Sequence, residues 1–511
     1  MKAKAHLEKA ISINPDFTEA YYKLGLLLKE DGDDQSALEH FQKAVSLNAE
    51  FAEAQCELAV SLASIKDFET ARNHFLNALE INPNYADAYF KYALFLIQIK
   101  DYEEAKNNFD KVTEINQNFA PAYYHKATLL TNADDFENAR KNYETAIDID
   151  ENYTESYYSL GKLLSGGVAT NKDGSIVDKT NLPESKDCFK KVIQLSPNHV
   201  KAHYNMAKIL LTEQNLSLSK THLLKALKID PQYSKAHYLV GNIYEKSENI
   251  KLALKHYLDS IKFYTDNALA HFRLGVILGK SGEHKKAEDN LKKAVSINPL
   301  HAEAHFHLAM ILREDDDENL AKKHFYKALE INPEYSLAYY ELAHHLEKNG
   351  DLNEAKIQFQ KATDVNQNFV KAYFNLARIL TSPSEYDQAI RNYETALEID
   401  PKFTQCHYWY AKILTTGERL LSDGTLVKEP NTKEAEKHLN LAIKLNPKFD
   451  KAYYRRGLLL KNKGDFVNAF KDFESAIKIN ASYSKAHYSM AVLLMNKEAN
   501  KVIEKHLRQK K

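Results

Sequence analysis

A segment of 34 residues recurs almost to the end of the chain, and this repetition constrains the fold more than any single motif. The segment Phe17–Glu50 is followed by similar segments at intervals of 34 or 46 residues. A fixed period in this range is typical of stacked repeats, in which each unit packs only on its neighbours. We therefore expect one continuous array rather than several globular domains. The later units begin at Phe51, Tyr85, Phe119, Tyr153, His199, Tyr233, Asn267, His301, Tyr335, Phe369, Phe403, Phe449 and Tyr483.

Each unit is predicted to contain two helices. In the first unit, apolar residues recur at helical spacing before and after Asp31-Gly32-Asp33, which combines a helix stop with a helix start. Small residues occupy fixed positions in both helices, so that the helices can approach closely, and bulky Phe41 fills the space between them. An Asn-Pro or Asp-Pro pair often follows the second helix and ends it.

These positions resemble the pattern of the tetratricopeptide repeat (TPR) family over nearly the whole chain. The resemblance implies an all-α solenoid, wound as a right-handed superhelix, whose first helices line a concave groove that binds other proteins. Where the family usually has Leu, this chain has Lys126 and Arg456, whose stems we expect to pack while their charged ends reach water. In the unit starting at Asn267, the matching residues are His271, Leu274, Gly275, Leu278, Ala287, Leu291, Ala294 and Pro299.

The repeat pattern predicts the organisation of the chain. Residues 1–16 match only the second helix of a unit, which indicates either a half-repeat cap or, as we favour, a chain cut from a longer protein. Thirteen TPR units follow over 17–482, with enlarged units at 153–198 and 403–448, and residues 483–511 form a partial repeat with a capping helix. Sequence around the two enlarged units also matches, which indicates duplication of a block.

Each enlarged unit carries an insertion between its two helices. Asp173-Gly174 in one insertion and Asp423-Gly424 in the other lie between residues that favour strands. We therefore expect a short β-hairpin with a two-residue turn in each. Leu426 and its apolar neighbours are too apolar for a free tip, so they either pack on a helix or contact a partner; a loop without a function is the alternative.

Aromatic residues occupy the fifth position of all but one of the first helices. They either support packing or present rings to a bound peptide. The exception is Cys56, and the set is Tyr22, Phe90, Tyr124, Tyr158, Tyr204, Tyr238, Phe272, Phe306, Tyr340, Phe374, Tyr408, Tyr454 and Tyr488.

Charge along the expected groove changes from acidic and apolar near the start to basic around each enlarged unit. Two basic zones favour binding of acidic segments or phosphates, although ordinary solvated lysines are the alternative. The candidates are Lys162, Lys201, Lys208 and Lys235 with the neighbouring Asn242 in one zone, and Lys371, Arg378, Lys412, Lys451 and Lys485 in the other.

Several classes of function are not expected. The formal net charge is −1, which argues against broad binding to nucleic acid or membranes. Cys56, Cys188 and Cys406 are far apart, so neither disulfides nor a zinc site is indicated, and a cytoplasmic location is the default. His301 and His305 have helical metal-ligand spacing, but the TPR pattern assigns His305 to packing. We expect no enzyme activity, no cofactor and no metal.

The sequence therefore predicts a non-enzymatic scaffold that binds a segment of another protein in the concave groove, with acidic segments as one candidate class. A structural subunit, a self-associating protein and the TPR targeting region of a larger enzyme such as a glycosyltransferase remain alternatives. The lysine clamp of Hsp70/Hsp90 co-chaperones would require Lys at the fifth position, which is aromatic here. An asparagine ladder like that of O-GlcNAc transferase is represented only by Asn205 and Asn375.

Overall fold

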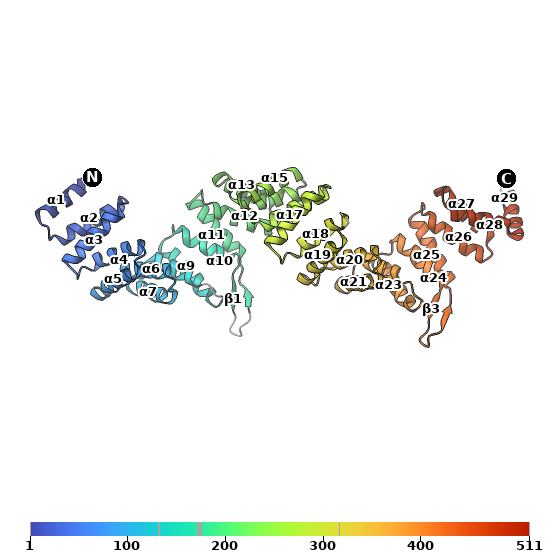
Figure 1. Cartoon of the computed structure of the whole chain (residues 1–511), viewed down its shortest axis with the longest axis horizontal. Coiled ribbons are helices and arrows are strands. Elements are labelled where there is room, and N and C mark those ends of the chain that lie inside the picture. The colour runs from blue at the N-terminus through green and yellow to red at the C-terminus, as the bar shows by residue number, and fades with distance from the viewer. Residues whose placement is uncertain (1, 131–132, 171–175, 316, 510–511) are drawn as a thin grey trace. The chain divides into compact units, whose positions relative to one another are not determined.

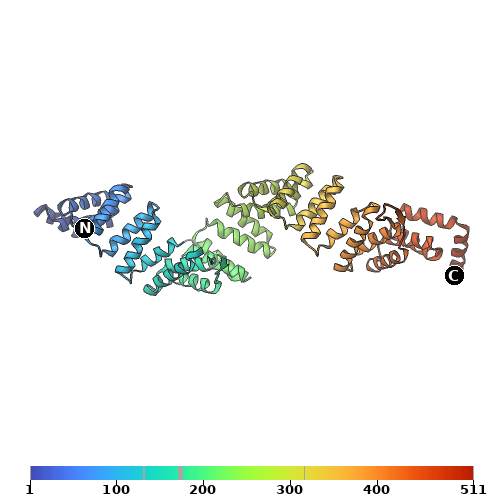
Figure 2. The ribbon, with the colours of Figure 1, turned by 90° about the horizontal axis from the view of Figure 1, so that it is seen from below.

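A computed structural model describes residues 2–130, 133–170, 176–315 and 317–509. The chain divides into two compact units, Met1–Phe263 and Tyr264–Lys511. Each unit is a stack of helix pairs that follow one another in chain order, as Figures 1 and 2 show. The all-α solenoid expected from the repeats is confirmed. No described helix has both the length and the apolar character that a membrane span requires.

The first unit consists of α1 followed by successive helix pairs. Its elements are α1 (Lys2–Ile13), α2 (Thr18–Glu30), α3 (Asp34–Leu47), α4 (Ala52–Ser64), α5 (Phe68–Ile81), α6 (Ala86–Gln98), α7 (Tyr102–Ile115), α8 (Ala120–Leu129), the 3₁₀ turn η1 (Ala133–Asp135), α9 (Phe136–Ile149), α10 (Thr154–Leu164), β1 (Val168–Thr170), β2 (Ile176–Asp178), α11 (Leu182–Leu195), α12 (Val200–Thr212), α13 (Leu216–Ile229), α14 (Ser234–Lys246) and α15 (Ile250–Phe263).

The second unit repeats this order and ends on α29. Its elements are α16 (Ala268–Lys280), α17 (His284–Ile297), α18 (Ala302–Glu314), α19 (Glu318–Ile331), α20 (Ser336–Lys348), α21 (Leu352–Val365), α22 (Val370–Ile379), η2 (Pro383–Glu385), α23 (Tyr386–Ile399), α24 (Thr404–Thr416), β3 (Glu418–Leu420), β4 (Leu426–Lys428), α25 (Thr432–Leu445), α26 (Asp450–Asn462), α27 (Phe466–Ile479), α28 (Ser484–Met495) and α29 (Lys497–Arg508).

Close packing within a helix pair depends on glycine opposite an aromatic ring. In the pair α2–α3, a Cβ atom added to Gly25 would lie 2.7 Å from Cε1 of Phe41, whose side chain is fully buried. Gly457 and Phe473 have the same relation in α26–α27. The prediction that a small residue lets the two helices approach while a bulky residue fills the space is therefore confirmed.

In several repeats, the turn between the two helices contains a residue with positive φ. Gly32 (φ +78°) lies between α2 and α3, and the next residue's amide, that of Asp33, donates to the carbonyl of Leu28 at 2.9 Å. Asp33 then caps α3 by accepting from the amide of Ser36. In the described part of the chain, the residues other than glycine in this conformation are Lys66, Lys100, Gln214 and Glu248.

Both insertions contain the expected two-stranded antiparallel hairpin (Figure 1), and these hairpins touch the helical array: β1 contacts η1 and α9, and β3 contacts η2 and α23. Asp173 and Gly174 lie outside the described residues. In the second hairpin, the expected two-residue turn is wrong: the strands are joined by 421–425, with the amide of Gly424 (φ +84°) donating to the carbonyl of Leu421. A turn followed by glycine in this conformation is typical of longer hairpin loops.

The basic residues at the family's Leu position do not simply reach water. Lys126 on α8 forms an ion pair with Asp110 on α7. Arg456 on α26 forms two bonds of 2.7 and 2.6 Å to the carboxylate of Asp472 on α27, and the side chain of Asp472 is buried. The expectation of solvated charged ends is therefore wrong, because an acidic residue on a second helix faces each one.

Successive first helices contact one another within each unit, for example α4 with α6, α24 with α26, and α26 with α28. We call the surface that they form the first-helix face. The side chains that the sequence proposes for binding in the groove belong to first helices.

Candidate functional site

The fifth-position aromatic residues mainly connect one repeat to the next. The ring of Phe374 is buried, whereas Tyr488 on α28 is 72% exposed. Packing is therefore the principal role of these aromatic side chains. Tyr488 differs because its side chain is largely exposed. Ring centroids are separated by 4.8 Å for Tyr158 and His199, 5.3 Å for Tyr204 and Tyr233, 5.0 Å for Phe374 and Phe403, 5.1 Å for Tyr408 and Phe449, and 5.0 Å for Tyr454 and Tyr483, while Tyr238 contacts Tyr257 of its own repeat at 5.9 Å.

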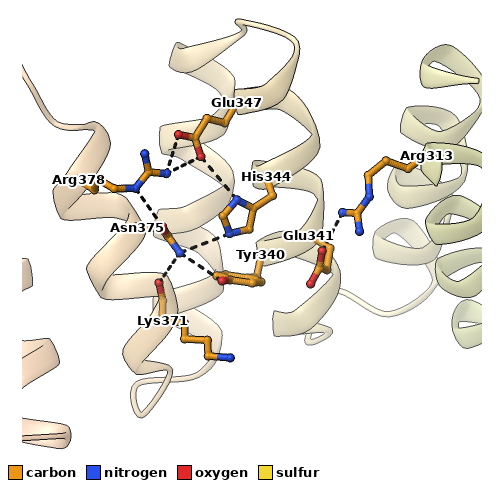
Figure 3. A network of polar contacts seen from close by, with 8 residues as sticks. All are labelled: Arg313, Tyr340, Glu341, His344, Glu347, Lys371, Asn375 and Arg378. Atoms are coloured by element: carbon orange, nitrogen blue, oxygen red, sulfur yellow. Dashed lines mark hydrogen bonds and ion pairs between the residues drawn. The ribbon is translucent and has the colours of Figure 1, made fainter. Parts of the chain in front are cut away.

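Arg378 belongs to a polar network on the first-helix face rather than standing free. Its Nη2 donates to both carboxylate oxygens of Glu347 at 2.6 and 2.7 Å, and its Nε donates to Asn375 at 3.2 Å. Figure 3 shows this network between α20 and α22. Because Glu347 already neutralises Arg378, this arginine is a weak candidate for an acidic partner. The exposed side chain of Lys371 points away from the network in the same view.

Four lysines that the sequence proposes for binding lie on first helices of the first unit. Lys162 on α10, Lys201 and Lys208 on α12, and Lys235 on α14 are all exposed. Within the described residues, none of them forms an ion pair. Lys208 also lines a pocket of about 80 Å³. Asn242 is engaged inside the repeat, since its side-chain oxygen accepts a 2.6 Å hydrogen bond from the hydroxyl of Tyr257.

In the second unit, a larger pocket lies where α22, α24 and β3 meet. Its volume is about 230 Å³, and Tyr386, Trp409 and Ile413 are among its lining residues. Lys412 also lines the pocket, and its ammonium group lies 4.2 Å from the centre of the Trp409 ring. The pocket therefore combines apolar walls with a cation held over an aromatic face.

Lys412, which lines this pocket, lies near two further cations, and within the described residues none of the three forms an ion pair. The pKa of Lys412 is lowered mainly by burial and, to a smaller extent, by the positive charges of Arg455 and Lys485. Nε of Arg455 is buried and has no hydrogen-bond partner in the described part of the chain, and its Nη1 lies 3.5 Å from Thr415. Lys485 is exposed, as is Lys451 on the same face. We call Lys412, Arg455 and Lys485 the cation cluster. Such a cluster favours binding of a negatively charged group.

Sequence reasoning did not select Trp409 or Arg455. Both follow a fifth-position aromatic residue directly, in a column that was considered only as an asparagine ladder. The same repeat position holds Glu57, whose carboxylate accepts hydrogen bonds from Lys29 and Lys91. Polar residues at this position are therefore the signal that could have identified Trp409 and Arg455.

The side chains of His301 and His305 contact different groups. Nδ1 of His301 accepts from the amide of Ala304 at 3.4 Å and so caps α18. Nε2 of His305 contacts the carbonyl of Pro299, and its Nδ1 contacts Nδ1 of His324 at 2.9 Å. Both histidines therefore have structural roles.

Comparisons with known proteins agree with this architecture. Sequence models described as the tetratricopeptide repeat match residues 6–39, 62–131, 120–153, 200–233, 268–299, 312–380, 370–403 and 450–483, which together exceed half of the chain. No curated protein matches significantly.

Three solved structures illustrate the likeness in fold. YrrB, described as a TPR protein with an unusual peptide-binding site, is 24% identical over 37% of this chain and 96% of its own, with a TM-score of 0.33. The Cut9–Hcn1 hetero-tetramer of APC/C is 16% identical over 96% of this chain and 92% of the other, with a TM-score of 0.36. Yeast Tom70 is 16% identical over 96% and 99%, with a TM-score of 0.33. Values this low support no transfer of function.

Proposed function

The chain belongs to the tetratricopeptide repeat family, and we propose that it is a non-enzymatic scaffold that binds an acidic segment of another protein on its first-helix face. TPR arrays are protein-interaction scaffolds in general; the acidic segment and its location are our proposal. The observation that carries it is the cation cluster beside the 230 Å³ pocket.

Positive charge around Lys412 is unbalanced. Lys412 is partly buried, and the charges that affect it most strongly are those of Arg455 and Lys485, which repel it. A carboxylate bound among the three cations would relieve this repulsion and satisfy the buried Nε of Arg455. An adjacent apolar side chain of the same segment would enter the pocket against Trp409 and Ile413. The preferred ligand is therefore an acidic residue next to a large apolar one.

The test is fluorescence anisotropy with labelled peptides that carry three glutamates beside one phenylalanine, measured at low salt. The variant combines Lys412→Glu with Lys485→Glu. The matched control combines Lys433→Glu with Lys444→Glu, two exposed lysines on α25, and causes the same change in net charge.

We expect the first variant to weaken binding about tenfold or more, since charge pairs near a surface contribute roughly 1 kcal/mol each and both attractions become repulsions. The control should change binding by less than about threefold. Equal effects of both variants, or no binding by the unaltered chain, would overturn the proposal. Replacing the phenylalanine of the peptide by serine tests the pocket separately.

Self-association is a second candidate, favoured by apolar side chains on the hairpins. Leu426 on β4 is 61% exposed, and Ile176 on β2 is 71% exposed. Sedimentation velocity over a range of concentrations would detect oligomers. If the hairpins form the interface, Leu426→Ser together with Ile176→Ser should shift the distribution to monomer, and a distribution that does not change would exclude this interface.

A further inference from the structure

We propose that His237, His256 and Asp259 form a binding site for a divalent transition metal ion, and that Zn²⁺ fits it best. His237 is on α14, and the other two residues are on α15, so the site lies within one repeat of the first unit. It is separate from the first-helix residues proposed above to bind an acidic segment.

The ligand atoms already lie close together. Nδ1 of His237 is 3.0 Å from Nδ1 of His256 and 3.9 Å from Oδ2 of Asp259. All three ligand atoms fall within 4.8 Å of one another, and no other group of three such ligands is found in the described part of the chain. In a tetrahedral zinc site with bonds of about 2.0–2.1 Å, neighbouring ligand atoms are roughly 3.3 Å apart. Small side-chain movements would therefore give three protein ligands.

The hydrogen bond on the opposite side of the His237 ring prepares it for a metal. Its Nε2 lies 3.0 Å from the carbonyl oxygen of Pro231 and must donate to it. In the neutral ring, Nδ1 therefore has a free electron pair directed toward His256. Histidine ligands of metals usually donate their second nitrogen to a carbonyl or carboxylate in this way. His256 binds through Nδ1 once its proton moves to Nε2, so the ring stays neutral.

Aromatic neighbours hold both rings in place. The ring of Phe263 lies 5.6 Å from that of His237, and Tyr244 stacks on His256 with an interplanar angle of 18°. The side chain of His237 is 9% exposed and that of Asp259 is 30% exposed. Water can therefore reach the site and supply a fourth ligand, while the histidines remain ordered before the metal binds.

Related histidine pairs elsewhere in the chain show why this site differs. His203 and His222 are also joined through their Nδ1 atoms, at 3.0 Å, on equivalent positions of α12 and α13. A histidine pair alone is explained by a hydrogen bond. Only the proposed site has an acidic residue three positions after the second histidine, where the other pairs have Lys225, Lys327 and Leu441. A lysine there supplies no ligand and repels a cation.

The test uses the whole chain, purified without a histidine tag, and isothermal titration with Zn²⁺ alone. The sequence has 21 histidines, so weak background binding is expected, and the measured quantity is the tightest class of sites. We expect one such site per chain. Asp259→Asn should weaken it by about 100-fold, because loss of even an outer-shell partner costs roughly 10–100-fold.

The second part of the test is a variant that should gain a Zn²⁺ site. Lys225→Asp places a carboxylate beside His203 and His222, on an exposed position, and should create a second tight site. X-ray absorption of the complex with one equivalent of Zn²⁺ should show two nitrogen neighbours from imidazole. The proposal is overturned if the unaltered chain has no site tighter than the background. It is also overturned if Asp259→Asn leaves the tight site unchanged, or if folded Lys225→Asp protein gains no site.

Discussion

Removal of the carboxylate of Asp472 should strongly destabilise the repeat formed by α26 and α27. The side chain of Asp472 is 5% exposed and that of Arg456 is 22% exposed, and two hydrogen bonds join them. Breaking one side of a buried pair typically costs about 3–5 kcal/mol. Arg456 is not fully buried and keeps a bond of 2.7 Å to Asn440, so we expect about 2–3 kcal/mol for Asp472→Ala.

The matched experiment replaces Arg456 by leucine, the residue that TPR repeats usually have at this position. Arg456→Leu alone leaves the buried carboxylate without its cation and should cost a similar free energy. The double variant Arg456→Leu with Asp472→Ala removes both charges, and its cost should fall to about 1 kcal/mol, since an apolar pair can replace a buried ion pair.

Hydrogen exchange of peptides from α26 and α27 is the appropriate measurement, because a long array opens repeat by repeat rather than as one cooperative unit. A loss of 2–3 kcal/mol corresponds to exchange roughly 30- to 150-fold faster, at about 1.4 kcal/mol per tenfold. Peptides from α2 and α3 of the same sample serve as the internal control. Exchange less than about threefold faster in Asp472→Ala, or a double variant as unstable as either single one, would refute the reasoning.

Three further predictions concern other repeats. Gly25→Ala should lower the local free energy of unfolding by about 1–3 kcal/mol, because the added carbon meets the ring of Phe41 at 2.7 Å. Hydrogen exchange of α2 and α3 measures this, and an unchanged exchange rate would contradict it. Burial, and then the neighbouring His305, lower the pKa of His324 to about 4, against an ordinary value of 6.5. The unfolded chain therefore takes up the proton first, so stability is constant above about pH 7 and falls between pH 6.5 and 4 by roughly 3 kcal/mol. NMR titration of the ring checks the pKa, and a value above 6 would be inconsistent with the packing. Glu57→Gln should lower the local free energy of unfolding by about 1–2 kcal/mol, since two lysines lose the charge of a carboxylate that is 8% exposed. Hydrogen exchange of α4 tests this, and an exchange rate within twofold of the original would exclude it.

The fold could be predicted because the same local rules recur in every repeat. Glycine opposite an aromatic ring, as in Gly25 and Phe41, and an acidic helix cap such as Asp33 can each be identified from residues close in sequence. The hairpins were also predicted from their strand-forming residues. The loop of the second was not, because Gly424 with positive φ suits both a two-residue turn and a longer one.

The candidate site could be predicted only in part, because charge pairing depends on residues one repeat away. Arg378 and Glu347 are 31 positions apart, and their bidentate contact depends on how α20 and α22 pack. The same sequence reasoning proposed Lys412 but not Arg455, whose charge reaches Lys412 from the next first helix. His237, His256 and Asp259 likewise come together only when α14 packs on α15.

Where the turn between two helices contains a left-handed residue, that residue need not be glycine. A side chain in this conformation costs roughly 1 kcal/mol, whereas glycine loses about 0.5–1 kcal/mol through the greater entropy of the unfolded chain. The two costs nearly cancel, so exchange of Gly32 for a residue like Lys100 is almost neutral. Residues such as Lys66, Gln214 and Glu248 can therefore occupy the turn in place of glycine without weakening the array.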